Sequence, residues 1–260
     1  MDEIKSITRE YLQNIAAKKK FNQEMIIKDY YVTLVVYLLK DIGGIYFKGG
    51  TALHKIFLQY ERLSEDADYT ITKDINEVKK EIEKRINNSG YFEKITKDKH
   101  VKDFVRLIAH YTDPFGNKGT IFIDLNKRAK LMLTPETYEI KHFYTEKIPP
   151  FSVTTLNQKE MLAEKVAATI GRNKPRDHFD VYQIIKRKMP IDLSLVKKKC
   201  ESSGDTFDIT KMFNNAKKLK NRWDEDMIPL LAEEIPFQDV MKTLAKYFKY
   251  AEKKEEKKLL

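Results

Sequence analysis

The order of segments between residues 45 and 71 constrains the fold of this chain more than any other feature. Ile45-Tyr46-Phe47 is a short apolar run typical of a strand, and Gly49-Gly50-Thr51 follows one residue later. Residues 52–57 have the apolar rhythm of a helix, whereas Asp66-Ala67-Asp68-Tyr69-Thr70-Ile71 alternates like a second strand. The sequence therefore predicts a strand, a glycine turn, a helix and a strand.

Helical and strand-like patterns also flank this segment. Two helices are expected in the first forty residues, the second capped by Asn22. The β-like runs Phe104–Tyr111 and Thr120–Leu125 enclose a turn signal and predict a hairpin, and a further strand is expected near Tyr138–Tyr144. Helical patterns continue after Pro150. We therefore predict an α+β fold, in which residues 1–150 form a mixed β-sheet core with N-terminal helices and residues 151–260 form a helical domain.

Composition restricts the class of protein further. The formal charge of +10 favours an anionic partner, although dispersed lysines alone also explain it. The single cysteine, Cys200, excludes an internal disulfide framework, and no Cys/His cluster offers a zinc site. No apolar stretch is long enough to span a bilayer, and the first residues lack the layout of a signal peptide. We predict a cytoplasmic protein with no membrane segment.

Asp66 and Asp68 are the main candidates for chemistry. Residues two apart on a strand point to the same face, and two carboxylates there repel each other unless a cation compensates them. Mg²⁺ prefers such oxygen ligands, but an Asp-x-Asp pair alone is more often a solvated surface pair. Gly49-Gly50-Thr51 changes that balance, because a glycine turn before a helix favours phosphate. Thr51 is expected either to cap the helix or to bind a phosphate oxygen.

Three further residues leave alternatives open. Asp124 ends an apolar strand, where it could act as a base, hold a second metal ion, or cap the turn at Asn126. Lys165 lies on an apolar helix and could extend harmlessly to solvent or bind a triphosphate. Asp180, one turn after Asp177, could orient Lys165 or a base.

Taken together, four segments resemble the AbiEii/AbiGii toxin family of nucleotidyltransferases, over about residues 24–225. They are Ile27-Lys28-Asp29-Tyr30; Phe47-Lys48-Gly49-Gly50-Thr51-Ala52-Leu53 with Arg62-Leu63-Ser64-Glu65-Asp66-Ala67-Asp68; Ile123-Asp124-Leu125-Asn126; and Glu160–Lys165 with Arg172, Lys174-Pro175-Arg176-Asp177 and Asp180-Val181-Tyr182.

This resemblance implies a nucleotidyltransferase-type sheet core and transfer of a nucleotide from an NTP to an acceptor, tRNA or another RNA, with Mg²⁺ or Mn²⁺. It implies a toxin with a cognate antitoxin, or a phage-defence role in abortive infection, and a helical domain that closes the active-site cleft. The residues it implies are Asp66, Asp68 and Asp124 for metal; Lys165 and Asp180, with these three aspartates, for catalysis; and Lys48, Gly49, Gly50, Thr51, Ser64 and Arg176 for the NTP phosphates.

Two other functions stay open from the sequence. A metal-dependent nuclease would use the same carboxylates without an NTP, which leaves the phosphate-type turn unexplained. A non-catalytic module would use the basic surface to bind nucleic acid or a partner protein.

Overall fold

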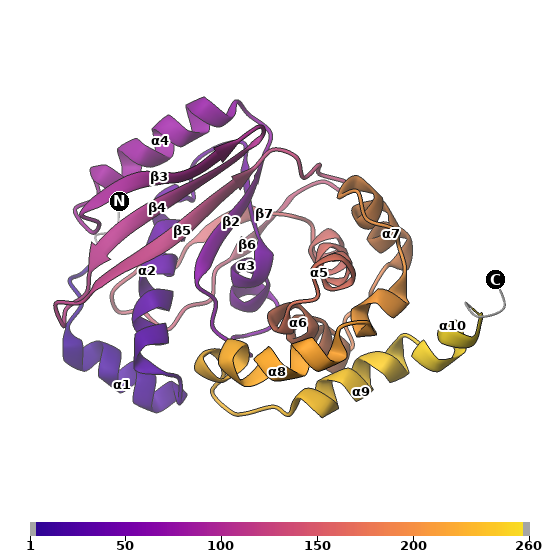
Figure 1. Ribbon diagram of the computed structural model, residues 1–260. Helices are drawn as coiled ribbons and strands as arrows, with labels where there is room; N and C mark the ends of the chain where they lie inside the picture. The colour runs from indigo at the N-terminus through magenta and orange to yellow at the C-terminus, as the bar shows by residue number, and fades with distance from the viewer. Residues whose placement is uncertain (1–3, 257–260) are drawn as a thin grey trace. The chain divides into compact units, whose positions relative to one another are not determined.

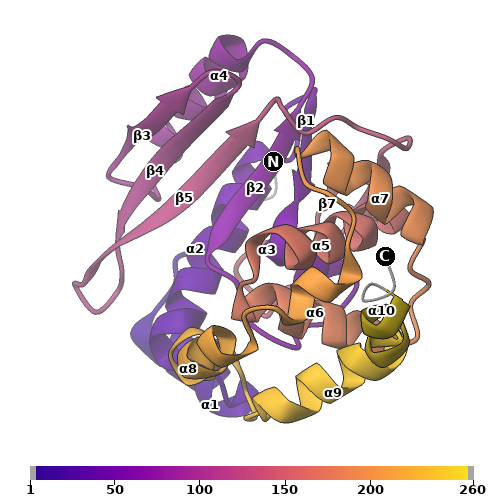
Figure 2. The same cartoon turned by 45° about the vertical axis from the view of Figure 1, so that its right-hand side comes forward.

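The protein forms two compact units, Met1–Asn157 and Gln158–Leu260, in a computed structural model that describes residues 4–256. The first unit contains a seven-stranded sheet (Figures 1 and 2). Its spatial order is β3-β4-β5-β2-β1-β7-β6. The strands are β1 (Ile45–Lys48), β2 (Asp66–Ile71), β3 (Lys94–Val101), β4 (Phe104–Thr112), β5 (Lys118–Asn126), β6 (Glu136–Glu139) and β7 (Ser152–Thr155).

The sheet is mixed. β2 runs parallel to β5 and β1 runs parallel to β7, whereas the other neighbouring pairs are antiparallel. The predicted hairpin is present as β4 and β5, which pair along their full lengths. The α+β prediction with a mixed sheet is therefore confirmed.

Four helices accompany this sheet: α1 (Arg9–Lys19), α2 (Gln23–Leu39), α3 (Gly49–Ile56) and α4 (Ile75–Asn87). α2 is apolar on nearly all sides and is buried along most of its length, as such a helix must be. Asn22 caps it by accepting hydrogen bonds from the backbone N–H groups of Glu24 and Met25, as predicted. α4 lies along β3 and β4 in Figure 1 and packs on them through apolar residues spaced three or four apart.

The second unit is helical. Its elements are α5 (Gln158–Arg172), α6 (Pro175–Lys186), α7 (Leu193–Ser202), the 3₁₀ turn η1 (Ile209–Phe213), α8 (Ala216–Met227), the 3₁₀ turn η2 (Ile228–Leu230), α9 (Phe237–Tyr247) and α10 (Tyr250–Glu256). α5 packs against α6 and α7, and α6 also packs against α8 and α9. Pro175 begins α6, where its missing N–H costs no hydrogen bond.

Several local expectations were wrong. The strand expected near Tyr138–Tyr144 ends at Glu139, and His142 accepts a hydrogen bond from the backbone N–H of Tyr144 in the turn that follows. β7 lies after Pro150 and pairs with β1 and β6, so residues 152–155 belong to the sheet rather than to a helix.

Among residues 4–256, no helix combines the length and the apolar character that crossing a membrane requires.

Candidate functional site

Four charged side chains form a row across the sheet. In the register of the strands, Lys48 of β1 lies beside Asp68 of β2, Asp68 beside Asp124 of β5, and Asp124 beside Arg106 of β4. Register partners share a face of the sheet, and Asp66 lies two residues before Asp68. The predicted aspartates therefore lie on one face, between a lysine and an arginine.

The two glycines of the turn lie directly against this row. A Cβ added to Gly49 would come within 2.2 Å of Asp68 Oδ2, and Gly49 has a φ of +76°. A Cβ added to Gly50 would lie 2.6 Å from Arg62 Nη2 and 3.3 Å from Ser64 Oγ. Glycine is required here because side chains approach the backbone closely. Acidic, basic and hydroxyl groups thus gather at the first turn of α3, where backbone N–H groups favour an anion.

Substituting Gly49 tests this packing. We expect Gly49→Ala to lose about 1–2 kcal/mol of folding free energy from the left-handed backbone alone, and to displace Asp68 in addition. Gly90→Ala is the matched control, because Gly90 has a φ of +74° and no heavy atom within 4 Å of an added Cβ. The measurement is denaturant unfolding of both variants. A loss of stability in Gly49→Ala no larger than that in Gly90→Ala would contradict the close approach of Asp68 to Gly49.

Thr51 does not cap α3, which was one of its two expected roles. α3 begins at Gly49, so Thr51 lies inside the first turn and not at its N-cap, which is Lys48. Its hydroxyl donates a hydrogen bond to the backbone carbonyl of Asp66. Thr51 therefore ties the glycine turn to the strand that carries the two aspartates.

Asp124 is engaged by Arg106. The guanidinium Nε and Nη2 each donate to one carboxylate oxygen of Asp124 at 2.7 Å, and this carboxylate raises the pKa of Arg106 above its ordinary value. The turn after β5 is capped by Asn126, which accepts hydrogen bonds from the backbone N–H groups of Arg128 and Ala129, so Asp124 does not cap it. Within the described chain, no group of three or more His, Cys, Asp and Glu side chains is arranged to hold a metal ion.

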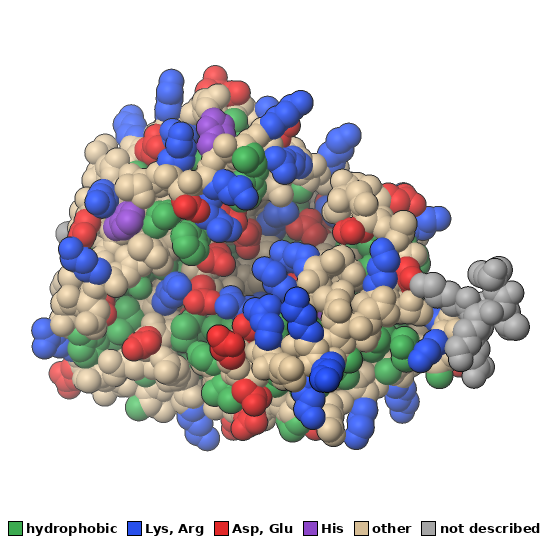
Figure 3. All heavy atoms as spheres, in the orientation of Figure 1, with side chains coloured by type: hydrophobic (Ala, Val, Ile, Leu, Met, Phe, Trp, Pro, Cys, Tyr) green, Lys and Arg blue, Asp and Glu red, His purple; other side chains and the backbone are tan. Residues whose placement is uncertain are grey.

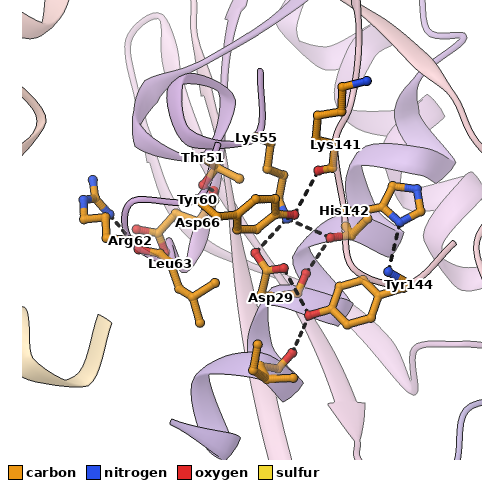
Figure 4. A network of polar contacts seen from close by, with 12 residues as sticks. Asp29, Thr51, Lys55, Tyr60, Arg62, Leu63, Asp66, Lys141, His142 and Tyr144 are labelled. Carbon is orange, nitrogen blue, oxygen red and sulfur yellow. Dashed lines mark hydrogen bonds and ion pairs between the residues drawn. The ribbon is translucent and has the colours of Figure 1, made fainter. Parts of the chain in front are cut away.

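A buried polar network connects α2 to α3 (Figure 4). Lys55 Nζ lies 2.7 Å from Asp29 Oδ1 and also donates to Thr33 Oγ1 and Tyr60 Oη, at 2.9 and 2.8 Å. The Lys55 and Asp29 side chains are each only 1% exposed. The Tyr144 hydroxyl lies 3.1 Å from the second Asp29 oxygen. Because Lys55 is on the helix that begins with the glycine turn, the network fixes the orientation of that helix.

His142, near this network, predicts a pH dependence of stability. Burial, with repulsion from Lys55 as a further cause, lowers the pKa of His142 to about 4. The unfolded chain then binds more protons than the folded protein between about pH 4 and pH 6.5, so stability falls as the pH is lowered through this window. We expect a loss of about 2 kcal/mol between pH 7 and pH 5 that is absent in His142→Gln. Denaturant titrations at both pH values measure it, and an equal loss in the variant would contradict the assignment.

The residues predicted from the helical half gather in the second unit. Lys165 Nζ lies 3.1 Å from Asp177 Oδ1 and 2.9 Å from Asp180 Oδ2, and Arg172 pairs with Asp177 at 2.9 Å. Burial alone would raise the pKa of Asp177, but Lys165 and Arg172 outweigh it and hold that pKa below its usual value. Asp177 and Asp180 thus both form ion pairs with Lys165. Arg176 is half-buried in the first turn of α6.

Glu160 has a structural partner that the sequence did not indicate. Its carboxylate is buried and lies 2.6 Å from Lys199 Nζ, which also pairs with Glu164 at 3.1 Å. These ion pairs join α5 to α7.

A comparison with known families decides the identity. The family model described as nucleotidyl transferase AbiEii toxin, type IV toxin–antitoxin system, matches residues 41–246. The chain belongs to this AbiEii family. It is a nucleotidyltransferase of the toxin type, as the resemblance implied.

Solved structures agree with the AbiEii fold. JHP933 from Helicobacter pylori is 18% identical, with a TM-score of 0.63 over 92% of this chain and 96% of that one. MenT4, a nucleotidyltransferase toxin from Mycobacterium tuberculosis, is 21% identical, with a TM-score of 0.61 over 81% of this chain and 72% of that one. The sequence has no significant match among curated proteins.

Two partners of the site were missed from the sequence of this AbiEii protein. Arg106 looked like one charge in an apolar strand, and only the register places it beside Asp124. Lys55 is one charged residue within the helical pattern of residues 52–57, and the sequence shows no partner for it. An aspartate within the apolar stretch of α2, at position 29, was the available signal that a buried cation lies nearby.

Proposed function

We propose that this AbiEii protein transfers a nucleotide from an NTP to RNA, with a divalent metal ion held by Asp66 and Asp68. The observation that carries the proposal is the placement of these two carboxylates on one strand beside the glycine turn of α3. Two same-face carboxylates supply hard oxygen ligands, and the turn supplies backbone N–H groups for phosphate.

The donor set fits Mg²⁺ or Mn²⁺. Asp66 and Asp68 would hold the ion, which when bound neutralises phosphate charge and polarises the phosphorus. Asp124 remains a proposed third carboxylate for the metal or for accepting a proton, and its pairing with Arg106 would have to loosen for either role. The proposed phosphate contacts are Lys48, Gly49, Gly50, Thr51, Ser64, Lys165 and Arg176.

The reaction balances without a further reactant. An acceptor hydroxyl oxygen forms a bond to the α-phosphorus as the bond to the β-phosphate bridging oxygen breaks, and pyrophosphate leaves. The hydroxyl proton passes to a carboxylate or to water. Lys165, fixed by its ion pairs to Asp177 and Asp180, is proposed to stabilise the triphosphate. Asp180 is proposed to be the second acidic residue needed for catalysis, and to act by positioning that lysine.

The family also supports a biological setting. The chain is of the type IV toxin–antitoxin kind, which implies an antitoxin partner and an NTP substrate. We propose that it acts in the cytoplasm, with a role in growth inhibition or phage defence, and that the helical unit helps close the active site on bound substrate.

Labelled nucleotides test this proposal. Purified protein is incubated with total RNA and each of the four α-³²P-labelled NTPs, with Mg²⁺ or with a chelator. We expect label in lengthened RNA for at least one NTP, and its loss when the metal is removed. RNA that shortens without NTP would indicate the nuclease, and RNA binding that survives chelation with no product would indicate a binding module.

A further inference from the structure

The face of the sheet that carries Asp66 and Asp68 continues across β5, β4 and β3. Along β4 and β5, alternate residues are fully buried and half-exposed. The buried set faces α2 and α4: Tyr111 of β4, for example, stacks on Tyr31 of α2 with ring centroids 3.7 Å apart. The half-exposed set shares the other face with the two aspartates, because Asp66 pairs with Phe122 and Asp68 with Asp124.

This second face combines aromatic, apolar and basic side chains. We define the strand platform by the residues that register places together on it: Lys94, Thr96, Lys99 and Val101 of β3; Phe104, Arg106, Ile108 and His110 of β4; and Thr120, Phe122 and Asn126 of β5. Val101 is 39% exposed, which is high for a large apolar residue, and Phe104 and Phe122 are half-buried. Arg106 lies over the Phe122 ring, 4.9 Å from its centroid.

Charge identifies the kind of partner. Residues 94–130 contain nine Lys and Arg against four Asp, so this segment carries half of the net charge of +10. Figure 3 has the orientation of Figure 1, so β3 to β5 lie at the same place in both views. Over these strands, Figure 3 shows Lys and Arg side chains with hydrophobic side chains among them. A basic surface interleaved with aromatic rings suits a single nucleic-acid strand, whose bases stack while its phosphates pair with cations.

We propose that the strand platform binds the single-stranded end of the acceptor RNA and leads it to Asp66 and Asp68. Phe104 and Phe122 stack on bases, Arg106 extends the stacking surface, and Lys94 and Lys99 pair with phosphates. Three strand spacings, about 14 Å, separate β3 from β2, so a few nucleotides span the platform. A duplex buries its base faces and would lose the stacking contacts. This inference rests on the proposed function, because it assigns that reaction its acceptor surface.

Direct binding without NTP tests the platform separately from the chemistry. The probe is a fluorescein-labelled single-stranded RNA of twelve nucleotides, and anisotropy gives Kd at several salt concentrations. We expect Phe104→Leu with Phe122→Leu, which keeps apolar bulk but removes both rings, to weaken binding about 10-fold or more. We expect Lys94→Glu with Lys99→Glu to weaken it as well and to reduce the slope of log K against log salt by about 1.4.

The matched control is Lys80→Glu with Lys84→Glu. These lysines are exposed on α4, which covers the opposite face of the sheet, and the change in charge is the same. Equal weakening by the control, or unchanged binding in both platform variants, would overturn the inference. If the double variant Phe104→Leu with Phe122→Leu does not fold, the variant with both exposed β3 lysines replaced by glutamate still tests the inference. Pyrophosphate release is measured in parallel: release without platform-dependent RNA binding contradicts the platform alone, whereas platform binding without release contradicts the transferase.

Discussion

Replacing Asp68 with asparagine is expected to reduce nucleotide transfer by about 1000-fold or more while the protein stays folded. The substitution keeps the size of the side chain but removes a charge from the row Lys48–Asp68–Asp124–Arg106. A carboxylate that holds a metal ion contributes several kcal/mol to the transition state, and about 4 kcal/mol corresponds to this factor. Asp66→Asn should behave in the same way. The measurement is incorporation of α-labelled NTP into RNA, with circular dichroism as the test of folding.

Asp41→Asn provides the matched control for this loss. Asp41 is 62% exposed and forms an ion pair with the neighbouring Lys40, so an equal change of charge there should leave transfer at the wild-type rate. Wild-type activity in Asp68→Asn would contradict the proposed role of Asp68 as a metal ligand. A variant that is inactive because it is unfolded would instead show a lost transition in thermal unfolding.

The second large effect concerns stability. Lys55→Met is expected to destabilise the fold by about 3–5 kcal/mol, because it leaves the Asp29 carboxylate buried without its cation. The loss of its hydrogen bonds to Thr33 and Tyr60 adds to that cost. Activity should fall with it, since the glycine turn begins the same helix. Denaturant unfolding at neutral pH gives the free energy of the variant.

A double variant separates the buried charge from lost packing. Asp29→Asn combined with Lys55→Met removes both charges, and we expect it to be more stable than Lys55→Met alone, as buried pairs replaced together often are. Lys79→Met is the control, because its ion pair with Glu83 is partly exposed and contributes less than about 1 kcal/mol. A small loss in Lys55→Met, equal to that of the control, would show that the pair is not needed.

The sequence predicts the centre of this fold better than its edges. Strong local signals found β1, the glycine turn and β2, and the turn between β4 and β5 predicted their hairpin. β3 was not singled out, because an edge strand rich in lysine lacks the apolar alternation of a half-buried strand. β7 has only four residues, and its pairing with β1 and β6 depends on distant parts of the chain.

The residues of the candidate site that are close together in the sequence were predicted, whereas their partners from distant segments were not. Asp66, Asp68 and the two glycines are close in the sequence, so their spacing alone was enough to predict that they form one site. The partner of Asp124 depends on the register between β4 and β5, and the partner of Asp29 depends on how α2 packs against α3. Neither register nor packing can be read from a single sequence, which is why Arg106 and Lys55 were not predicted.

The most direct test of nucleotide transfer uses two positions of the same label. Protein, RNA and Mg²⁺ are incubated with an NTP labelled either at the α-phosphorus or at the γ-phosphorus. We expect the α label to enter the RNA and the γ label to appear only in pyrophosphate, in equal amounts. Transfer of the γ label to RNA or protein, or shortening of the RNA without any NTP, would contradict this expectation.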